Sequence, residues 1–442
     1  MINITQLSET MRTVMQTRAQ EIGREHEAFK RERKLDGASL VQGLVFGWLQ
    51  NGDASLSELQ AAFNLANVEI SRQGIDQRFT MEMADFLREL VVESASSIVR
   101  AQPVETPVLQ RFEHVYVMDG TRIELPDMLS DQWQGTGGYN KPEGGATIKL
   151  GVRWDVRNGQ ITDLELQDGV AHDSQASFQQ ATLPPNSLRI GDLAYHALDV
   201  FEQIGEDGSY WFTKYKTGTN VYLSPETDAT PIDLASWLPS RVGDRTDQVV
   251  YLGREKRLRC RLIAQRVPQD VVQQRQADLQ ETARRRQQPV GQQAYALACW
   301  TIHLTNAPQE KITCEEAFVL GRYRWQIELL FKLWKDELDL DKSRSQNPAR
   351  ILCELYAKLI GILINHWCLL LSCWHLERRS LWRAAKITRQ FGWILCAALP
   401  FPFILSWVLK VMCRAVRGAK MEKSQQAPRT FQLWDELAES AA

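Results

Sequence analysis

The hydrophobic periodicity of the chain changes at residues 101–103. Before this point, apolar residues recur at three- and four-residue spacing, and Ser55 with Glu58 forms a capping-box pattern, so the sequence predicts helices over residues 1–105. After it, apolar and polar residues alternate over 114–126, 146–156 and 159–171, which predicts a meander of three strands. A strand running into a helix follows over 187–204, so we expect a layered α/β domain.

Strand patterns resume at Tyr210 and are interrupted by the polar stretch 269–293, for which a helix or a flexible excursion is expected. A helical pattern returns at Thr313, which begins a second capping box, and continues through apolar and basic segments to the end of the chain. We therefore divide the sequence into five parts. These are a helical region 1–105, an α/β core in two pieces, 106–209 and 312–345, a β-rich insertion 210–311, and a helical region 346–442.

Two interpretations suit the N-terminal helices. The segment 64–79 has the pattern of the second helix of a helix-turn-helix, which would present Ser71, Arg72, Gln77 and neighbouring polar residues to a DNA groove. A solvated helix in a small bundle fits equally well, because helix pairs joined by a short turn are common.

The apolar stretches 359–374 and 391–409 are expected to be buried or to lie at a dimer interface. The first has polar residues in its middle and is shorter than the roughly 20 residues of a bilayer span, so we predict no membrane association. The eight cysteines show no metal-binding spacing, which favours a reduced cytoplasmic location. The 52 Lys plus Arg against 54 Asp plus Glu do not exclude nucleic-acid binding, because opposite charges can be segregated.

Two aspartates follow apolar strand patterns. Asp119 ends an apolar run and precedes a glycine, so we expect it at the rim of the sheet beside a turn, and Asp192 ends the strand that begins near residue 187. Strand ends are where α/β sheets place ligands. Aspartate also favours turns for local reasons, so each signal is weak alone.

A third carboxylate lies on the helix predicted over 322–337. Arg324, Glu328 and Lys335 are four and seven residues apart and share one face, which Lys332 can join. A surface ladder of ion pairs is the alternative, but the surrounding residues are too apolar for a solvated face. Three carboxylates suit phosphodiester chemistry with two divalent ions, for which Mg²⁺ needs only oxygen ligands. A glycoside hydrolase would also use paired carboxylates.

Three motifs, DGT at 119–121, D-x-A-Y at 192–195 and RWQIELLFKLWK at 324–335, resemble the signature regions of bacterial insertion-sequence transposases with a DDE triad. The resemblance is to the insertion sequence four family, in the branch that carries the YREK signature. The resemblance implies a ribonuclease-H-like core interrupted by the β-rich insertion, with Asp119, Asp192 and Glu328 as catalytic and metal-binding residues. It implies Mg²⁺ as cofactor, with Mn²⁺ as substitute. It also implies that Arg324 and Lys335 contact DNA phosphates near the transposon end. Lys332, which can share their helix face, is a further predicted DNA contact.

The resemblance further implies the function: cutting at transposon ends, joining to target DNA, and cut-and-paste movement through a hairpin. The expected partners are double-stranded DNA with terminal inverted repeats, target DNA, and a second protomer bound through the C-terminal helices. Gly321 stands where the signature has its tyrosine. A catalytically silent DNA-binding relative is therefore an alternative.

Two further DNA contacts are predicted. Trp300 occupies the place of the family's indole that stacks on a flipped base, although a core tryptophan is an equal alternative. Arg257 and Arg259 belong to a basic run that would present one cationic strand face to phosphates. The alternative is that this segment is a run of solvated charges without a binding role.

Overall fold

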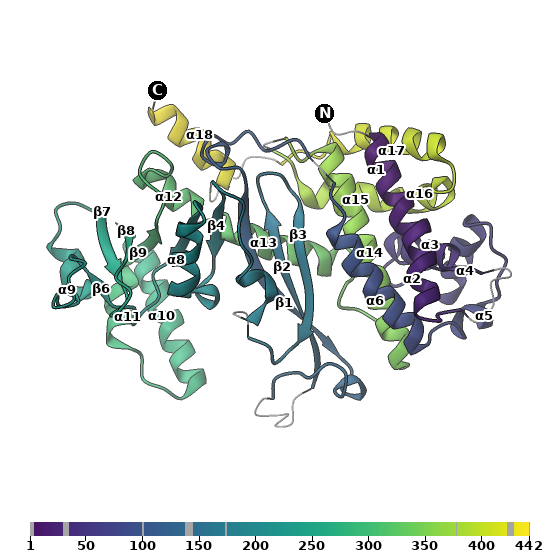
Figure 1. Cartoon of the computed structure of the whole chain (residues 1–442), viewed down its shortest axis with the longest axis horizontal. Helices are drawn as coiled ribbons and strands as arrows, with labels where there is room; N and C mark the ends of the chain where they lie inside the picture. The colour runs from purple at the N-terminus through teal and green to yellow at the C-terminus, as the bar shows by residue number, and fades with distance from the viewer. Residues whose placement is uncertain are drawn as a thin grey trace. The chain divides into compact units, whose positions relative to one another are not determined.

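The protein is a mixed α/β structure with a large sheet and many helices (Figure 1). The computed structural model describes residues 4–29, 35–99, 101–137, 145–172, 175–376, 378–421 and 428–441. Contacts divide the chain into two compact units. The first unit comprises Met1–Glu105, Asp119–His172 and Ile327–Ala427, and the second comprises Thr106–Met118, Asp173–Gln326 and Pro428–Ala442.

The N-terminal part of the first unit is helical, as predicted. Capping boxes define two of the helix starts, formed by Asp36 with Ser39 and by Ser55 with Glu58. The predicted box at Ser55 is thereby confirmed. The helices are α1 (Ile4–Arg12), α2 (Ala19–Glu25), α3 (Gly37–Gln50), α4 (Leu56–Leu65), α5 (Arg72–Asp76) and α6 (Met81–Ser96).

The prediction of a long second helix over 64–79 is wrong. Helix α4 ends at Leu65, Asn67 adopts the left-handed conformation with φ of 59°, and only the five residues of α5 are helical. Asparagine tolerates this conformation, which stops a helix. The polar residues of this segment are nevertheless exposed, as expected for Ser71, Arg72 and Gln77. The basic segment 30–34 lies outside the described residues.

Strands β1 (Val115–Leu125), β2 (Ala146–Asp155) and β3 (Ile161–Asp168) confirm the predicted meander, with order β3-β2-β1. The β2–β3 turn requires a glycine. Gly159 has φ of +81°, and a Cβ atom there would lie 2.5 Å from Trp374 Cε2. Trp154 Nε1 and His366 Nε2 lie 3.0 and 2.6 Å from the Gly159 carbonyl oxygen.

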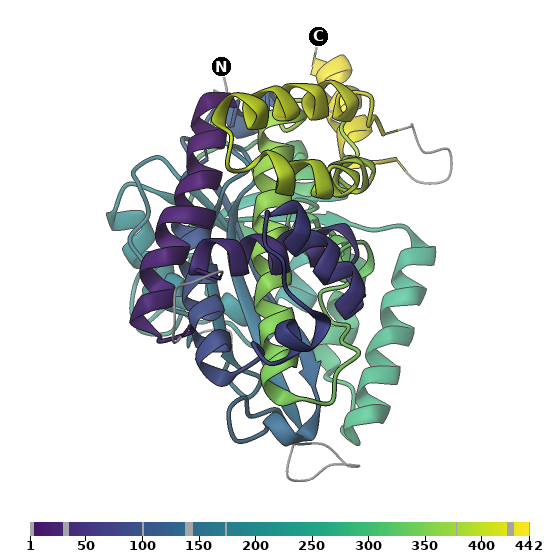
Figure 2. The same cartoon turned by 90° about the vertical axis from the view of Figure 1, so that its right-hand side faces the viewer.

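The C-terminal part of the first unit is organised around α14 (Pro348–Ser372), which packs on α3, α6, α15 and α17 (Figure 2). This helix is long and apolar enough to cross a membrane, but its most apolar window is fully buried among the other helices, as in many core helices. The predicted burial of 359–374 is confirmed. The other helices here are α15 (Leu381–Gln390), α16 (Gly392–Ala398) and α17 (Pro402–Val416).

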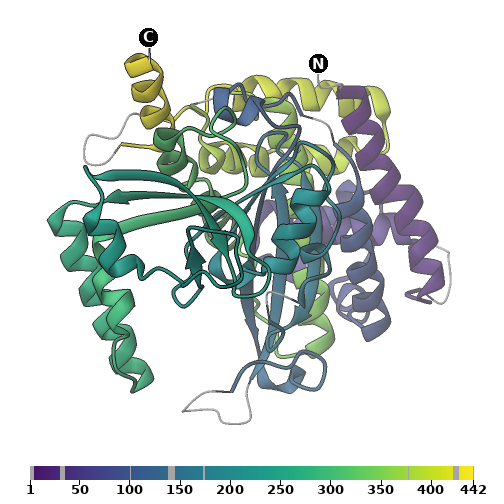
Figure 3. The ribbon, with the colours of Figure 1, turned by 60° about the vertical axis from the view of Figure 1, so that its left-hand side comes forward.

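The second unit is built on a mixed sheet of order β1-β4-β5-β9-β8-β7-β6, in which β1 takes part through its first residues. Strands β4 and β5 run parallel to β1, whereas the pairs from β5 to β6 are antiparallel (Figure 3). The strands are β4 (Leu188–Gly191), β5 (Tyr210–Lys214), β6 (Val221–Tyr222), β7 (Arg245–Leu252), β8 (Leu258–Arg266) and β9 (Trp300–Thr305).

The polar stretch after β8 forms the 18-residue helix α10 (Gln269–Arg286), which settles the choice between a helix and a flexible excursion. The helical pattern after Thr313 is broken at Gly321 into α12 (Cys314–Leu320) and α13 (Arg324–Asp336). The other helices of the unit are α7 (Pro107–Gln110), α8 (Leu198–Glu206), α9 (Leu234–Trp237), α11 (Gln292–Ala296) and α18 (Thr430–Ala441). The division into five segments drawn from the sequence remains a prediction.

Candidate active site

Asp119 lies inside strand β1, not at its end. The strand continues to Leu125, so the predicted position beside a turn is wrong. The apolar run does end here, because Val115–Met118 are buried and Asp119 is half-buried. Its Oδ1 atom accepts a hydrogen bond of 2.8 Å from the Gly120 N–H. The carboxylate is thus fixed where the buried strand becomes accessible.

Asp192 directly follows strand β4, as predicted. It caps the short 3₁₀ helix Leu193–Tyr195, and its Oδ1 atom accepts a hydrogen bond of 2.6 Å from the Leu193 N–H. Its other oxygen lies 3.7 Å from Arg324 Nη1, with the two side chains 38% and 16% exposed. The structure therefore brings together a carboxylate and an arginine that the sequence had singled out separately.

Glu328 is half-buried on α13, whose apolar face buries Ile327, Leu330 and other residues. On the same helix Lys332 is exposed, while Lys335 Nζ donates a hydrogen bond of 2.8 Å to the Arg122 carbonyl oxygen of β1. Lys335 thus ties the Glu328 helix to the Asp119 strand within the first unit.

The oxygen-only character of these candidates suits a hard divalent cation. Asp119 and Glu328 belong to the first unit and Asp192 to the second. Among the described residues of either unit taken alone, no three His, Cys, Asp or Glu side chains are grouped as metal ligands. Carboxylates without His or Cys partners fit Mg²⁺ better than zinc, which prefers nitrogen and sulfur.

Gly321 lies against a buried histidine. A Cβ atom at this position would be 2.7 Å from His303 Cε1. His303 is 3% exposed and stacks on Phe212 with 4.7 Å between ring centroids. Burial lowers its pKa to about 3, so the ring is neutral at pH 7. The backbone at 321 has no room for the signature tyrosine while His303 keeps this place.

Trp300 is a core residue. It is 4% exposed within the apolar cluster of the second unit, and the Arg266 guanidinium lies 5.2 Å from its ring centroid. Arg275 Nη1 also donates to the Trp300 carbonyl oxygen at 2.8 Å. The alternative of a core tryptophan, which the sequence left open, describes this residue, and we do not assign it to base stacking.

The basic run before and within β8 does not form one cationic strand face. Arg257 lies in the preceding turn with φ of 49°, and its guanidinium lies 3.3 Å from the Tyr222 ring centroid. Lys256 pairs with Asp199 at 2.8 Å, which raises the pKa of this lysine. Arg259 is exposed. The spacing of the basic residues suggested that they alternate along a strand and share one face. Instead, Lys256 and Arg257 bind groups within the protein.

Glu354 and Lys358 of α14 were not among the residues predicted to be functional. Their side chains are 5% and 1% exposed and form a 2.7 Å ion pair. A signal was present, because two opposite charges four residues apart interrupt an otherwise apolar run. Charged residues are almost never buried unless they are paired, so two opposite charges within an apolar helix predict a buried ion pair.

Comparisons with known proteins agree with the resemblance seen in the sequence. A profile of the family described as "Transposase DDE domain" matches residues 110–364, a range that contains Asp119, Asp192 and Glu328. The chain is 27% identical over 378 residues to the transposase for insertion sequence element IS231F of Bacillus thuringiensis subsp. israelensis, which covers 81% of this chain and 78% of that protein.

Two other relatives come from different genera. The chain is 22% identical over 362 residues to the transposase for insertion sequence element IS1151 of Clostridium perfringens, covering 78% of this chain and 76% of that protein. It is 24% identical over 358 residues to the transposase for insertion sequence element IS421 of Escherichia coli, covering 76% of this chain and 86% of that protein.

Proposed function

The chain belongs to the transposase DDE domain family of DNA-cleaving and strand-transferring enzymes, and from this premise we propose that it moves its own element by a cut-and-paste route. Water first cuts one strand at the transposon end. The freed 3′-hydroxyl attacks the opposite strand and closes a hairpin, which a second hydrolysis reopens. The same hydroxyl then attacks target DNA. The observation that carries the proposal is the family match over residues 110–364.

DDE enzymes require a divalent metal, and we propose Mg²⁺ with Mn²⁺ as substitute. Asp119, Asp192 and Glu328 are the proposed catalytic ligands. Bound divalent ions would activate the attacking oxygen and stabilise the leaving oxygen at phosphorus. Asp119 and Glu328 support this assignment, because their half-buried carboxylates are accessible and their backbones belong to strand β1 and helix α13. Phosphodiester chemistry is favoured over sugar hydrolysis by the family match.

The proposed DNA contacts are Arg324, Lys332, Lys335 and Arg259. Exposure supports Lys332 and Arg259. Arg324 lies beside Asp192, which supports a role in binding phosphate near that carboxylate. Each such contact adds affinity without reading sequence, because phosphate neutralisation releases counterions. We assign recognition of the element's terminal inverted repeats to the helical N-terminal region.

We assign protomer pairing to the helices α16 and α17. Five large apolar side chains here are strongly exposed, including Phe403 at 91% and Trp407 at 63%. Such a patch on a folded surface marks an interaction site more often than a solvated face. The other members of the patch are Ile394, Phe401 and Ile404. The proposed location is the bacterial cytoplasm, at the nucleoid when the protein is bound to DNA.

Cleavage of a duplex carrying the inverted repeats that flank the coding sequence tests the function. The purified full-length protein with Mg²⁺ or Mn²⁺ should nick the repeat end and then yield a hairpin on denaturing gels. Asp119→Asn, Asp192→Asn and Glu328→Gln should each lower cleavage by at least about 1,000-fold, because each removes a charged ligand from the reaction centre. Their binding of the same duplex should remain.

Three outcomes separate the alternatives. Nicking without a hairpin would contradict the proposed route but keep the enzyme. Binding without nicking in either metal would identify the silent DNA-binding alternative that Gly321 suggested. Cleavage that persists in the three carboxylate variants would refute the site assignment.

A further inference from the structure

A buried network lies directly behind the helix that carries Glu328. Helix α13 ends at Asp336, and the following turn, residues 337–343, crosses to α14. Asp339 in this turn has φ of 51°, a left-handed conformation that strains the backbone of a non-glycine residue. Such a conformation persists only where its surroundings fix it.

Lys358 of α14 binds the backbone of this turn. Its Nζ atom donates to the carbonyl oxygens of Asp339 and Lys342 at 3.0 and 2.6 Å and pairs with Glu354 Oε1 at 2.7 Å. An ammonium group has three protons, so all of them have partners here. Ser343 Oγ completes the network with a hydrogen bond of 3.0 Å to Glu354 Oε2.

Helix α15 holds the same turn from another direction. Arg389 donates to the Glu337 carbonyl oxygen and lies 3.5 Å from the Asp339 carboxylate. Trp382 Nε1 donates to Glu337 Oε1 at 2.5 Å. Backbone carbonyls and side chains of the turn are therefore both held by charged or aromatic donors.

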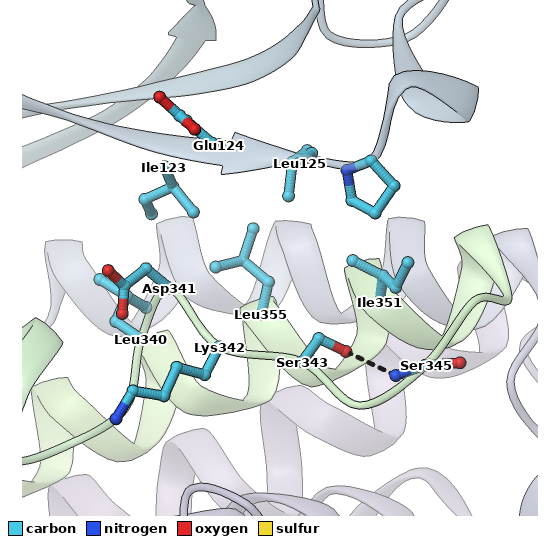
Figure 4. A pocket seen from close by; sticks show the side chains of 11 residues that line it. Ile123, Glu124, Leu125, Leu340, Asp341, Lys342, Ser343, Ser345, Ile351 and Leu355 are labelled. Carbon is cyan, nitrogen blue, oxygen red and sulfur yellow. Dashed lines mark hydrogen bonds between the residues drawn. The ribbon is translucent and has the colours of Figure 1, made fainter.

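The turn also faces the strand that carries Asp119. A cleft in the first unit separates Ile123–Pro126, at the end of β1, from residues 340–343 of the turn and Ser345, and Ile351 and Leu355 of α14 also line it (Figure 4). One turn earlier on α13, Lys335 bonds to Arg122 of β1. The last residues of α13 and the turn that follows them therefore both lie beside the end of β1.

We infer that Lys358, paired with Glu354, is a positioning residue that fixes the turn 337–343 and through it the placement of Glu328. The inference rests on the proposed role of Glu328 as a metal ligand. A buried ion pair alone is weak evidence of stabilisation, since well-packed apolar residues often replace one without loss. Lys358 differs from such a pair because its ammonium group also donates two hydrogen bonds to backbone carbonyl oxygens of the turn. An apolar residue cannot make these hydrogen bonds.

The test uses the full-length variant Lys358→Met/Glu354→Leu, which replaces the pair with apolar residues of similar size and leaves no unpaired buried charge. Lys342→Met is the matched control. It removes a lysine from the same turn whose side chain is 61% exposed and pairs with Asp339. Both variants should unfold cooperatively and bind the repeat duplex like the wild type.

Mn²⁺ titration of cleavage provides the first measurement. The double variant should require about 10-fold to 100-fold more Mn²⁺ for half-maximal cleavage, as is typical when residues that support metal ligands are lost, and high Mn²⁺ should restore part of the rate. The control should follow the wild-type curve. A double variant with the wild-type metal dependence would overturn the inference, as would a loss that added metal does not change.

Amide hydrogen exchange provides a measurement that does not depend on cleavage. Peptides covering 337–343 and the last turn of α13 should exchange roughly 10-fold faster in the double variant than in the control. Equal protection would overturn the inference. If the wild type does not cleave in either metal, the proposed function fails, and the exchange result still decides whether Lys358 holds the turn.

Discussion

Helices α14 and α17 look alike in sequence and differ in the structure. Both are apolar, begin with a proline and carry basic residues. In α14 the most apolar window is fully buried, and even Glu354 and Lys358 lie inside. In α17 the buried face is narrow, while Phe403 and Trp407 are 91% and 63% exposed.

The difference teaches that apolar composition does not report how many sides of a helix are covered. Helix α14 has neighbours around it, so its charges must be paired. Helix α17 leaves aromatic side chains at the surface, where a partner rather than the fold accounts for them. Substitutions should therefore affect folding in α14 and association in α17.

The largest effect is expected for Lys358→Met alone, which strands the Glu354 carboxylate inside the first unit. Breaking a buried pair from one side should lower the free energy of unfolding by about 3–5 kcal/mol, measured by urea denaturation. Lys342→Met, an exposed pair in the same turn, should change it by less than about 1 kcal/mol. Equal effects of the two variants would break the contrast between buried and exposed positions.

His366 of α14 should make the first unit acid-sensitive. Burial lowers its pKa from 6.5 to about 4, so the folded state holds the neutral ring while the unfolded state binds a proton. The resulting stability is complete above pH 6.5 and is lost as pH falls toward 4, for a total of roughly 3 kcal/mol. His366→Gln should therefore show a smaller stability loss than wild type between pH 7 and pH 4.5. Parallel curves for the two proteins would contradict this.

A smaller and opposite effect is expected at Gly361 of α14. A Cβ atom there would lie 3.4 Å from Leu49 Cβ, an ordinary contact. Gly361→Ala should stabilise the protein by about 0.5–1 kcal/mol through helix propensity. Gly159→Ala is the contrasting variant, because its φ of +81° and its contact with Trp374 leave no space. Thermal melting of both would show whether α14 tolerates a methyl group where β2–β3 does not.

The smallest effect on folding is expected on α17. Phe403→Ser and Trp407→Ser should change the free energy of unfolding by less than about 0.5 kcal/mol, because both side chains are mostly in water. Sedimentation analysis should show weaker self-association in both variants. A wild-type protein that stays monomeric at micromolar concentration, with and without DNA, would contradict the assignment of this patch to protomer pairing.

Much of the architecture was predictable from local pattern. Alternation predicted β1, β2 and β3, and the capping boxes at Ser55 and Thr313 marked helix starts that the structure contains. The helix over 64–79 was predicted wrongly, because periodicity does not register the left-handed Asn67. Trp300 and Arg257 showed the same limit, since a strand pattern does not reveal whether a side chain meets solvent or a neighbour.

The sequence by itself determined the family, the order of the elements and the three candidate carboxylates, because these depend on residue type and spacing along the chain. Only the tertiary structure decided which cationic side chains are bound to other groups of the protein and which are exposed to solvent. It paired Arg324 with Asp192, held Lys335 on β1 and buried Lys358 under the turn after the Glu328 helix. The physical reason is that a charge is solvated or paired according to neighbours from distant segments, and spacing along the chain does not encode those neighbours.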